Sequence, residues 1–446
     1  MADEIAIVGA GLSGNLLAIM LARHGLAVTV YERQAEPSEA MTEAGRSINL
    51  ALAARGIRAL EQAEVFADIE SLLIPMQGRV IHEGSGPERF LAYGQHRNET
   101  IWSVSRHELN QRLFKIARDR WNVSYRFGHA CVEFDVEQNS MTLASDGGEI
   151  QIEPELLLAA DGAGSMIRRQ LAAAGSITAT EDLLDHGYKE LTIPALANGE
   201  PALSSDGLHI WPRGGFMLIA LPNLDRSFTA TLFLPHDGQP GFDSVTVDNV
   251  QQFFSDQFGD VIHCMPDLVR EFSAKPIGTL GTVHCNPWSR NSASGRSVLL
   301  VGDAAHAIVP FHGQGMNAAF EDCAEFERLI TEFDSDWRAV VERFEDARRE
   351  NVLAIAEMAL ENYQEMRDSV REPAFERRAM LSFDLERRFP GRFIPRYSMV
   401  MFHPEIGYAE AQRRGRTQAS ILDEALAAND QAKSLGIASE LVEKSL

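Results

Sequence analysis

Hydrophobic residues change their spacing twice within the first 35 residues of the chain. A continuous apolar run from Ile5 to Val8 predicts a buried strand, and a glycine-rich turn separates it from an apolar helix over about residues 13–24. A second strand is expected over residues 27–31. This order of elements predicts a βαβ unit, in which the two strands pair in parallel.

Farther along the chain, the pattern predicts both helices and strands. Helical spacing over about residues 108–119 precedes short alternating segments from 124 to 158, which predict a β-meander. Residues 187–233 contain apolar segments broken by Gly and Pro, and they predict a second, largely antiparallel sheet. A buried-strand run at 297–301 then leads into expected helices over about 316–333 and 337–366.

Composition and charge narrow the classes of function. The 446 residues include 41 Lys and Arg against 64 Asp and Glu, a net charge of −23, which disfavours nucleic acid and anionic membranes as partners. The four cysteines form no CxxC pair, and neither metal-ligand spacing nor a nucleophile motif is found, so we expect no disulfide framework and no metal.

The apolar runs are shorter than the ~18 to 20 residues of a membrane span. Because the acidic N-terminus does not resemble a secretory leader, we expect a cytoplasmic protein.

The first turn carries a dinucleotide fingerprint. Its glycines have the spacing G-x-G-x-x-G between a strand and a helix, which lets a pyrophosphate approach the backbone and the helix N-terminus. Glu32, at the end of the second strand, can accept hydrogen bonds from an adenosine ribose. NAD and FAD are equally compatible with this fingerprint alone. The expected contacts are Gly9, Gly11, Leu12, Ser13, Gly14, Glu32 and Arg33.

Two later motifs distinguish between these cofactors. The segment 160–165, ADGAGS, followed by Arg168, resembles the DG motif of the flavoprotein aromatic hydroxylases, although many relatives have Gly where this chain has Ala160. The segment 302–306, GDAAH, followed by Pro310, resembles their GD motif, in which the Asp binds the flavin ribityl chain. The resemblance implies FAD as the bound cofactor and NADPH as a co-substrate that has no Rossmann domain of its own.

A helix that begins after Gly313 has free N-terminal amides, which can stabilise negative charge on a reduced flavin. Arg106, at the start of another expected helix, resembles a flavin phosphate or ribityl contact. The remaining expected cofactor contacts are therefore Arg106, Asp161, Asp303, Gly315, Met316 and Asn317.

Longer segments resemble one family within this class, the kynurenine 3-monooxygenases. They cover residues 45–52, 78–79, 103–106, 186–191, 208–212, 309–317, 361–363 and 392–397, and the resemblance runs from residue 5 to about 402. It implies hydroxylation of L-kynurenine to 3-hydroxykynurenine with NADPH and O2, through a flavin hydroperoxide. Because the residues after Pro404 are too polar for a membrane anchor, the resemblance is to the soluble bacterial members.

The fold class expected from pattern and resemblance is α/β. A discontinuous Rossmann-like FAD-binding domain is expected over residues 1–75, 101–180 and 286–370, the last part including a long helix. A mainly antiparallel β-sheet substrate domain is inserted over 76–100 and 181–285. A C-terminal helical region follows over 371–446.

The resemblance also assigns the substrate site. The substrate's amino-acid end is expected at Arg79, Tyr93, Asn362 and Tyr397, since a guanidinium and neutral donors suit a carboxylate. Taken singly, Arg79 is equally consistent with a surface arginine, and the apolar positions with ordinary core. No catalytic residue is expected, and His312 is expected to order water at the pocket wall rather than to act as an acid or base. The expected ring pocket comprises Ile101, Ile219, Leu221, Phe233, Pro310, Phe311, His312 and Met366.

Two alternatives remain open at this point. The chain is also compatible with a related flavin hydroxylase of another aromatic acid, or with a flavin-binding sensor that has no turnover. The oligomeric state is not determined by the sequence, and a homodimer is one option. The preference between NADPH and NADH is equally undetermined.

Overall fold

The computed structural model describes residues 5–37, 49–84, 86–96, 98–367, 373–428 and 430–446, and they form two compact units. Unit 1 spans residues 1–73, 104–183 and 281–352, and unit 2 spans 74–103, 184–280 and 353–446. The expected domain boundaries stay a prediction; the structure divides the long helix at Val352, whereas the sequence analysis assigned it as a whole to the FAD-binding domain. Residues 45–48 of the first family-like segment lie outside the described residues.

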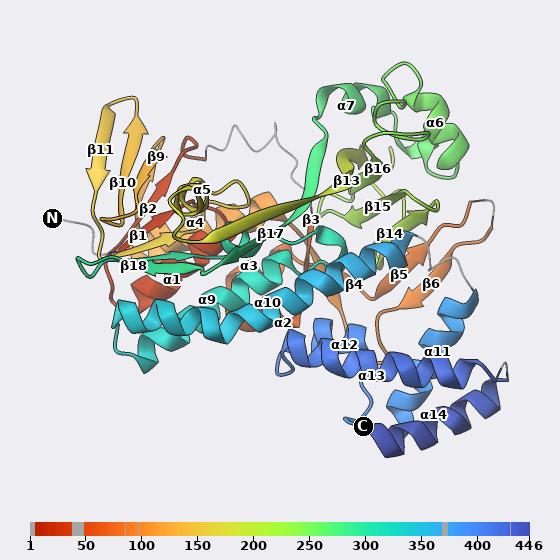
Figure 1. Ribbon diagram of the computed structural model, residues 1–446. Coiled ribbons are helices and arrows are strands. Elements are labelled where there is room, and N and C mark those ends of the chain that lie inside the picture. Colours follow the sequence, from red (N-terminus) through yellow and green to blue (C-terminus); the bar gives the residue numbers. More distant parts are fainter. Residues whose placement is uncertain (1–4, 38–48, 85, 97, 368–372, 429) are drawn as a thin grey trace. The chain divides into compact units, whose positions relative to one another are not determined.

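Unit 1 is built on a six-stranded sheet with the order β18-β19-β12-β1-β2-β8. Figure 1 labels β1, β2 and β18 of this sheet. Strand β1 pairs in parallel with β2 and β12, and β12 pairs in parallel with β19. All residues of β1, β12 and β19 are buried, as is typical of parallel strands covered on both faces. The predicted α/β class and βαβ unit are confirmed. The strands of this sheet are β1 (Ile5–Val8), β2 (Val28–Glu32), β8 (Ser124–Phe127), β12 (Leu156–Ala159), β18 (Ser289–Asn291) and β19 (Ser297–Leu300).

The predicted meander is a smaller sheet in unit 1, with the order β11-β10-β9. Its strands pair antiparallel, whereas β8 and β12, which flank it in the sequence, belong to the parallel sheet. The other strands that lie within or enter unit 1 are β3 (Asn49–Leu52), β7 (Ile101–Ser105), β9 (Ala130–Asp135), β10 (Ser140–Ser145) and β11 (Gly148–Ile152).

Helix α4 (Arg106–Trp121) extends beyond the predicted range at both ends because its ends are capped. The Ser105 side chain accepts a hydrogen bond from the Glu108 amide at 3.3 Å, as in a capping box. Asn122 ends the helix in a left-handed conformation with φ 53°. The other helices that lie within or begin in unit 1 are α1 (Leu12–Arg23), α2 (Ala54–Gln62), α3 (Phe66–Ile69), η2 (Glu70–Leu72), α5 (Met166–Ala173), α8 (Asp303–His306), η4 (Pro310–His312), α9 (Gly315–Glu332) and α10 (Trp337–Arg367).

Unit 2 contains the second predicted sheet, a seven-stranded one with the order β17-β13-β16-β15-β14-β5-β6. Neighbouring strands from β13 to β14 pair antiparallel, and β14 pairs in parallel with β5. Helices α6 (Val250–Gln257) and α7 (Leu268–Ala274) contribute Phe254 and Phe272 to the core on one face of this sheet. The remaining strands are β4 (Ile74–Met76), β5 (Gly78–Ile81), β6 (Arg89–Ala92), β13 (Thr178–Ile193), β14 (Gly207–Pro212), β15 (Met217–Pro222), β16 (Phe228–Pro235) and β17 (Gly278–Asn286).

The C-terminal residues form helices, as their pattern predicts. Helices α11 (Pro373–Arg388), α13 (Tyr408–Leu426) and α14 (Gln431–Ser445) pack together around Leu385, Phe393 and Ala425 (Figure 1). The short elements of unit 2 are η3 (Ile262–Cys264) and α12 (Arg396–Phe402).

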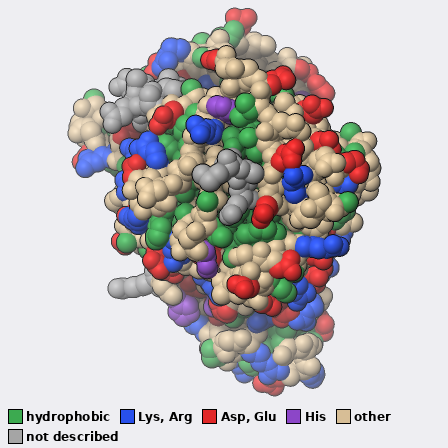
Figure 2. Space-filling view, turned by 90° about the vertical axis from the view of Figure 1, so that its left-hand side faces the viewer, with side chains coloured by type: hydrophobic (Ala, Val, Ile, Leu, Met, Phe, Trp, Pro, Cys, Tyr) green, Lys and Arg blue, Asp and Glu red, His purple; other side chains and the backbone are tan. Residues whose placement is uncertain are grey.

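Two further observations concern the surface of the protein and its helices. Lys and Arg side chains on the face drawn in Figure 2 lie among Asp and Glu side chains rather than gathered together. None of the helices in the described residues combines the length and the apolar character that a membrane crossing needs.

Candidate functional site

Three neighbouring parallel strands of unit 1 end at the three motifs singled out in the sequence. Strand β1 leads into the glycine fingerprint, β12 into Asp161, and β19 into Asp303. Because β1 pairs in parallel with β12, and β12 with β19, their carboxyl ends meet at one edge of the sheet. This edge is where nucleotides bind in open α/β sheets.

The motifs approach one another closely at this edge. A Cβ atom on Gly9, whose φ is +104°, would lie 2.4 Å from the Ala160 carbonyl oxygen. A Cβ on Gly302, whose φ is +59°, would lie 2.9 Å from the Ser13 hydroxyl oxygen. A Cβ on Gly11, in contrast, would meet no described atom within 4 Å. The backbone at Gly11 is therefore open to a phosphate, as the fingerprint requires.

Asp161 is held by its own motif and keeps one buried oxygen for another partner. Its Oδ2 accepts a hydrogen bond from the Met166 amide at 2.9 Å, and burial raises the pKa of the carboxyl. Its Oδ1 is buried and has no hydrogen-bond partner among the described residues. A buried acceptor without a hydrogen bond costs about 1–3 kcal/mol, and a donor group on a bound ligand would remove this cost.

Asp322 fixes the turn that carries Asp303, and the sequence analysis did not identify it. It is completely buried, and its Oδ2 accepts hydrogen bonds from the Gly302 amide at 3.1 Å and from His306 Nε2 at 2.6 Å. Its Oδ1 accepts from Arg348 Nε at 2.8 Å. Burial opposes the charge of Asp322, but His306 and Arg348 outweigh it and lower the pKa. Asp303 itself is exposed, as a ligand contact requires.

Helix α9 begins beside the same motifs with uncapped amides. The side chain of Gln314, at its N-cap, makes no capping hydrogen bond. The Asn317 side chain accepts from the Ala53 amide at 2.9 Å and donates to the carbonyl oxygens of Ala51 at 2.9 Å and Gly313 at 2.8 Å. Its side chain thus holds the loop, so only its backbone amide, with those of Gly315 and Met316, can serve the cofactor as predicted.

Helix α4 places Arg106, another predicted cofactor contact, near the glycine fingerprint. Asn110 Nδ2 donates to the Ala10 carbonyl oxygen at 3.0 Å, and Arg106 is exposed one turn earlier on α4. Glu32 Oε2 accepts from the Ala10 amide at 2.8 Å, so its carboxylate lies against the glycine turn, with Arg33 exposed next to it. Open backbone, an unsatisfied carboxylate oxygen and free helix amides together fit FAD.

Predicted substrate residues lie on one face of the sheet in unit 2. Arg79 on β5 is opposite Leu208 on β14, and Ile210 on β14 is opposite Ile219 on β15. Opposite residues of neighbouring strands share a face, as do alternate residues along a strand. Arg79, Ile219 and Leu221 therefore point to the same side of the sheet.

Phe233 belongs to this face as well, because it lies opposite Met217 on β15. The alternate residues of β15 and β16 form the core on the other face; they include Leu218, Ala220 and Leu232. The strand alternation thus separates the expected ring pocket from the core of unit 2.

A cation and two phenols form a buried cluster at the expected amino-acid end of the substrate. The Arg79 guanidinium carbon lies 4.8 Å from the centre of the Tyr397 ring, and Tyr397 stacks on Tyr93 at 5.7 Å. Burial raises the pKa of both phenols, so they stay neutral and able to donate. Burial lowers the pKa of Arg79, but the interactions with Tyr397 and Glu365 outweigh the effect of burial. The pKa of Arg79 is therefore raised above its usual value.

Glu365, which the sequence analysis missed, lies next to this cluster. Its Oε1 is 3.5 Å from Arg79 Nη1, and its side chain is 32% exposed. Asn362 and Met366 on the same helix, α10, are both buried, and Asn362 Nδ2 donates to Met366 Sδ at 3.3 Å. A cation and an anion side by side match both charges of an α-amino acid.

The other expected pocket residues have different positions. Ile101 is buried in β7, opposite Met76. Pro310, Phe311 and His312 form η4 in unit 1, directly before α9, with Phe311 and His312 buried. Their part in a common pocket with unit 2 stays a prediction.

Comparison with known proteins extends these observations. The model of the family described as FAD binding domain matches residues 3–357. The chain is 42% identical over 429 residues to a kynurenine 3-monooxygenase of Stenotrophomonas maltophilia (strain K279a), covering 96% of this chain and 93% of that protein. It is 40% identical over 459 residues to a kynurenine 3-monooxygenase of Dictyostelium discoideum, covering 99% and 98%.

Solved structures agree on the fold. A tetrameric form of 2-methyl-3-hydroxypyridine-5-carboxylic acid oxygenase superposes with a TM-score of 0.66 at 20% identity, over 86% of this chain and 97% of that one. The p-nitrophenol 4-monooxygenase of Pseudomonas putida DLL-E4 gives a TM-score of 0.66 at 16% identity, over 86% and 94%. At this level of identity the likeness concerns the fold alone.

Proposed function

Because the chain belongs to the kynurenine 3-monooxygenase family of FAD-binding proteins, we propose that it hydroxylates L-kynurenine to 3-hydroxykynurenine with NADPH and O2. The observation that carries this proposal is the buried cluster of Arg79, Tyr93 and Tyr397 beside an apolar strand face. The cluster suits an amino-acid head group, and the strand face suits an aromatic ring.

The residues of this chain bind and orient the reactants. FAD, when bound, supplies electron transfer from NADPH and the activation of dioxygen. Arg79 holds the substrate carboxylate, and the neutral phenols of Tyr93 and Tyr397 donate hydrogen bonds to it without adding negative charge. The amides at the start of α9 stabilise negative charge on the cofactor.

Two features favour kynurenine over other aromatic acids. A simple aromatic acid offers a carboxylate alone, whereas the pair of Arg79 and Glu365 offers a partner for a carboxylate and for an ammonium group. The substrate's own amino group activates its ring, so no base is needed to deprotonate a phenol. The residues expected around the ring on this strand face, Ile219, Leu221 and Phe233, are themselves apolar.

The test is product identification from a panel of substrates. The FAD-loaded protein would receive NADPH and O2 with L-kynurenine, with anthranilate, which lacks the α-amino-acid group, or with 4-hydroxybenzoate. We expect 3-hydroxykynurenine from L-kynurenine and no hydroxylated product from the other two. Product from anthranilate or 4-hydroxybenzoate instead of kynurenine would favour the related hydroxylase, and no product from any of them would favour a sensor.

The oligomeric state and the cellular location of the protein are two further predictions. We expect a cytoplasmic protein, and a homodimer is the oligomer kept open by the sequence analysis. Light scattering of the purified holoenzyme, which gives the mass in solution, tests the dimer against a monomer or a tetramer.

A further inference from the structure

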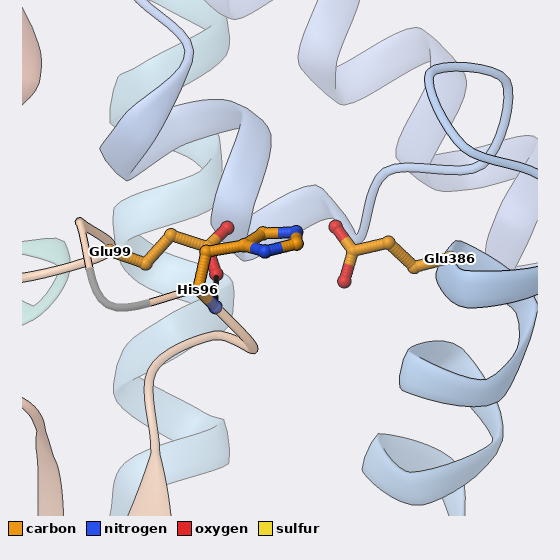
Figure 3. A group of neighbouring side chains, drawn as sticks. All are labelled: His96, Glu99 and Glu386. Carbon is orange, nitrogen blue, oxygen red and sulfur yellow. Dashed lines mark hydrogen bonds between the residues drawn. The ribbon is translucent and has the colours of Figure 1, made fainter.

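A group of metal-ligating side chains lies in unit 2, apart from the residues assigned above. His96 and Glu99 belong to the connection between β6 and β7, and Glu386 lies on α11. One ligand atom from each residue lies within 4.8 Å of the other two. Figure 3 shows the His96 ring between the two carboxylates.

The two carboxylates of this group are buried. Glu99 is 6% exposed and Glu386 is 8% exposed. In the described part of the chain, neither forms an ion pair with Lys or Arg, and the positive charges that lower the pKa of Glu386 are those of His96 and His403. Two buried carboxylates at this separation repel each other and lose hydration, so the arrangement is costly unless a cation or a proton lies between them.

The hydrogen bonds of the group orient the carboxylates and leave oxygens for a ligand. The His96 amide donates to Glu99 Oε2 at 2.7 Å, and Gln95 Nε2 donates to Glu386 Oε2 at 2.5 Å. Each bond uses one oxygen of its carboxylate. Gln95 is itself held through a hydrogen bond from Arg387, so the orientation of Glu386 is supported by a second layer of contacts.

We propose that His96, Glu99 and Glu386 bind a divalent transition-metal ion, with Zn²⁺ as the best match. One imidazole and two carboxylates are ligands that Zn²⁺ accepts in a four-coordinate site, with water in the fourth position. The exposed His96 gives the ion a route of entry from solvent. The imidazole favours Zn²⁺ over Mg²⁺, which prefers oxygen ligands alone.

Such an ion would join the β6–β7 connection to α11 within unit 2. Tyr93 of the substrate cluster lies at the start of this connection, so the ion would restrain the backbone that carries it. The sequence analysis expected no metal, because Glu386 is far from the other two residues in the sequence and no spacing rule joins them. The site does not depend on the proposed hydroxylase activity.

The test is calorimetric titration of the chelator-treated holoenzyme with ZnCl₂, and separately with MgCl₂. Three variants are compared with the parent protein: His96→Ala, Glu386→Gln, and His263→Ala as a control at an exposed histidine elsewhere in unit 2. We expect one Zn²⁺ per chain, with affinity at least about tenfold lower in His96→Ala and Glu386→Gln and unchanged in His263→Ala.

A second measurement guards against loss of folding in the variants. Thermal unfolding without metal should be similar in all four proteins, and Zn²⁺ should raise the transition temperature of the parent and of His263→Ala only. Absence of Zn²⁺ binding by the parent, or equal Zn²⁺ affinity in all four proteins, would overturn the proposal. Tighter binding of Mg²⁺ than of Zn²⁺ would also overturn it.

Discussion

At the scale of single residues, Arg79 is the group on which we propose that recognition of the substrate carboxylate depends. Arg79→Ala removes a buried cation and its hydrogen bonds, which are worth about 1.5–3 kcal/mol. We expect KM for L-kynurenine to rise by about 10- to 100-fold while FAD stays bound. Steady-state kinetics and the flavin absorbance of the purified variant measure the two effects.

The control for this substitution is Arg270→Ala on α7. Arg270 is an arginine of unit 2 whose side chain is 71% exposed and pairs only locally with Asp267. Its removal should leave KM unchanged. An unchanged KM in Arg79→Ala would show that the carboxylate binds elsewhere.

The phenols of the cluster make a prediction about pH. Burial raises the pKa of Tyr93 and Tyr397 above the usual value of about 10, so folding favours their protonated forms. Their contribution to stability is therefore complete below the unfolded-state pKa and is lost only as the pH rises through the folded-state pKa. We expect neither phenol to contribute a titration to KM between about pH 7 and 8.5. An apparent pKa in this range that disappears in Tyr397→Phe would contradict the assignment.

Asp303 makes a prediction about the cofactor rather than the substrate. It is an exposed carboxylate at the end of a buried strand, where it can accept hydrogen bonds from the flavin ribityl chain. Loss of a charged hydrogen bond costs about 1.5 kcal/mol or more, so Asp303→Ala should weaken FAD binding by about tenfold or more. Fluorescence titration of the apoprotein with FAD measures this affinity, and equal affinities would contradict the role.

At the scale of elements, helix α9 supports the cofactor edge of the sheet through Asp322. Asp322→Asn removes the charge that pairs with buried Arg348, and removal of one partner of a buried pair costs about 3–5 kcal/mol. We expect lower stability in urea and weaker FAD binding, because the single acceptor oxygen of Asn cannot serve the Gly302 amide, His306 and Arg348 together. The lowered pKa of Asp322 means that this stabilisation is present at neutral pH and is lost as the pH falls through that value.

A control on the same helix separates this effect from a general loss of charge. Glu325→Gln removes a carboxylate of α9 that pairs with exposed Arg328. Its effect on the free energy of unfolding should be below about 1 kcal/mol, as for most surface pairs. Similar losses in Asp322→Asn and Glu325→Gln would contradict a special role for Asp322.

Strand elements show what alternation can and cannot reveal. Alternating positions in β15 and β16 divide into a core face and a face with Ile219, Leu221 and Phe233, and this division follows from the sequence once the strands are placed. In β15 the pattern does not show which face meets the core, because both faces are apolar, whereas in β16 Thr229 and Thr231 distinguish the face of Phe233 from the core face. The resemblance to a family, rather than the periodicity, selected the pocket face.

At the scale of the whole molecule, the sequence predicted the motifs that follow individual strands, but it did not predict contacts between segments that are far apart in the chain. The fingerprint, Asp161 and Asp303 each follow a buried strand, so strand patterns and motifs sufficed to place them at one sheet edge. Glu365 and Asp322 lie on helices whose polar positions look alike in sequence. Only the folded chain shows which of these carboxylates meets an arginine.

The most direct test of the central claim is a single-turnover stopped-flow experiment on the FAD-loaded protein. NADPH is mixed without oxygen, with and without L-kynurenine, the loss of flavin absorbance is followed, and the product is identified after oxygen is admitted. Kynurenine-dependent acceleration of the absorbance loss, followed by 3-hydroxykynurenine in proportion to the flavin, is the result we predict. An equal rate of absorbance loss with and without L-kynurenine, with hydrogen peroxide as the sole product, would contradict the assignment of kynurenine as the substrate.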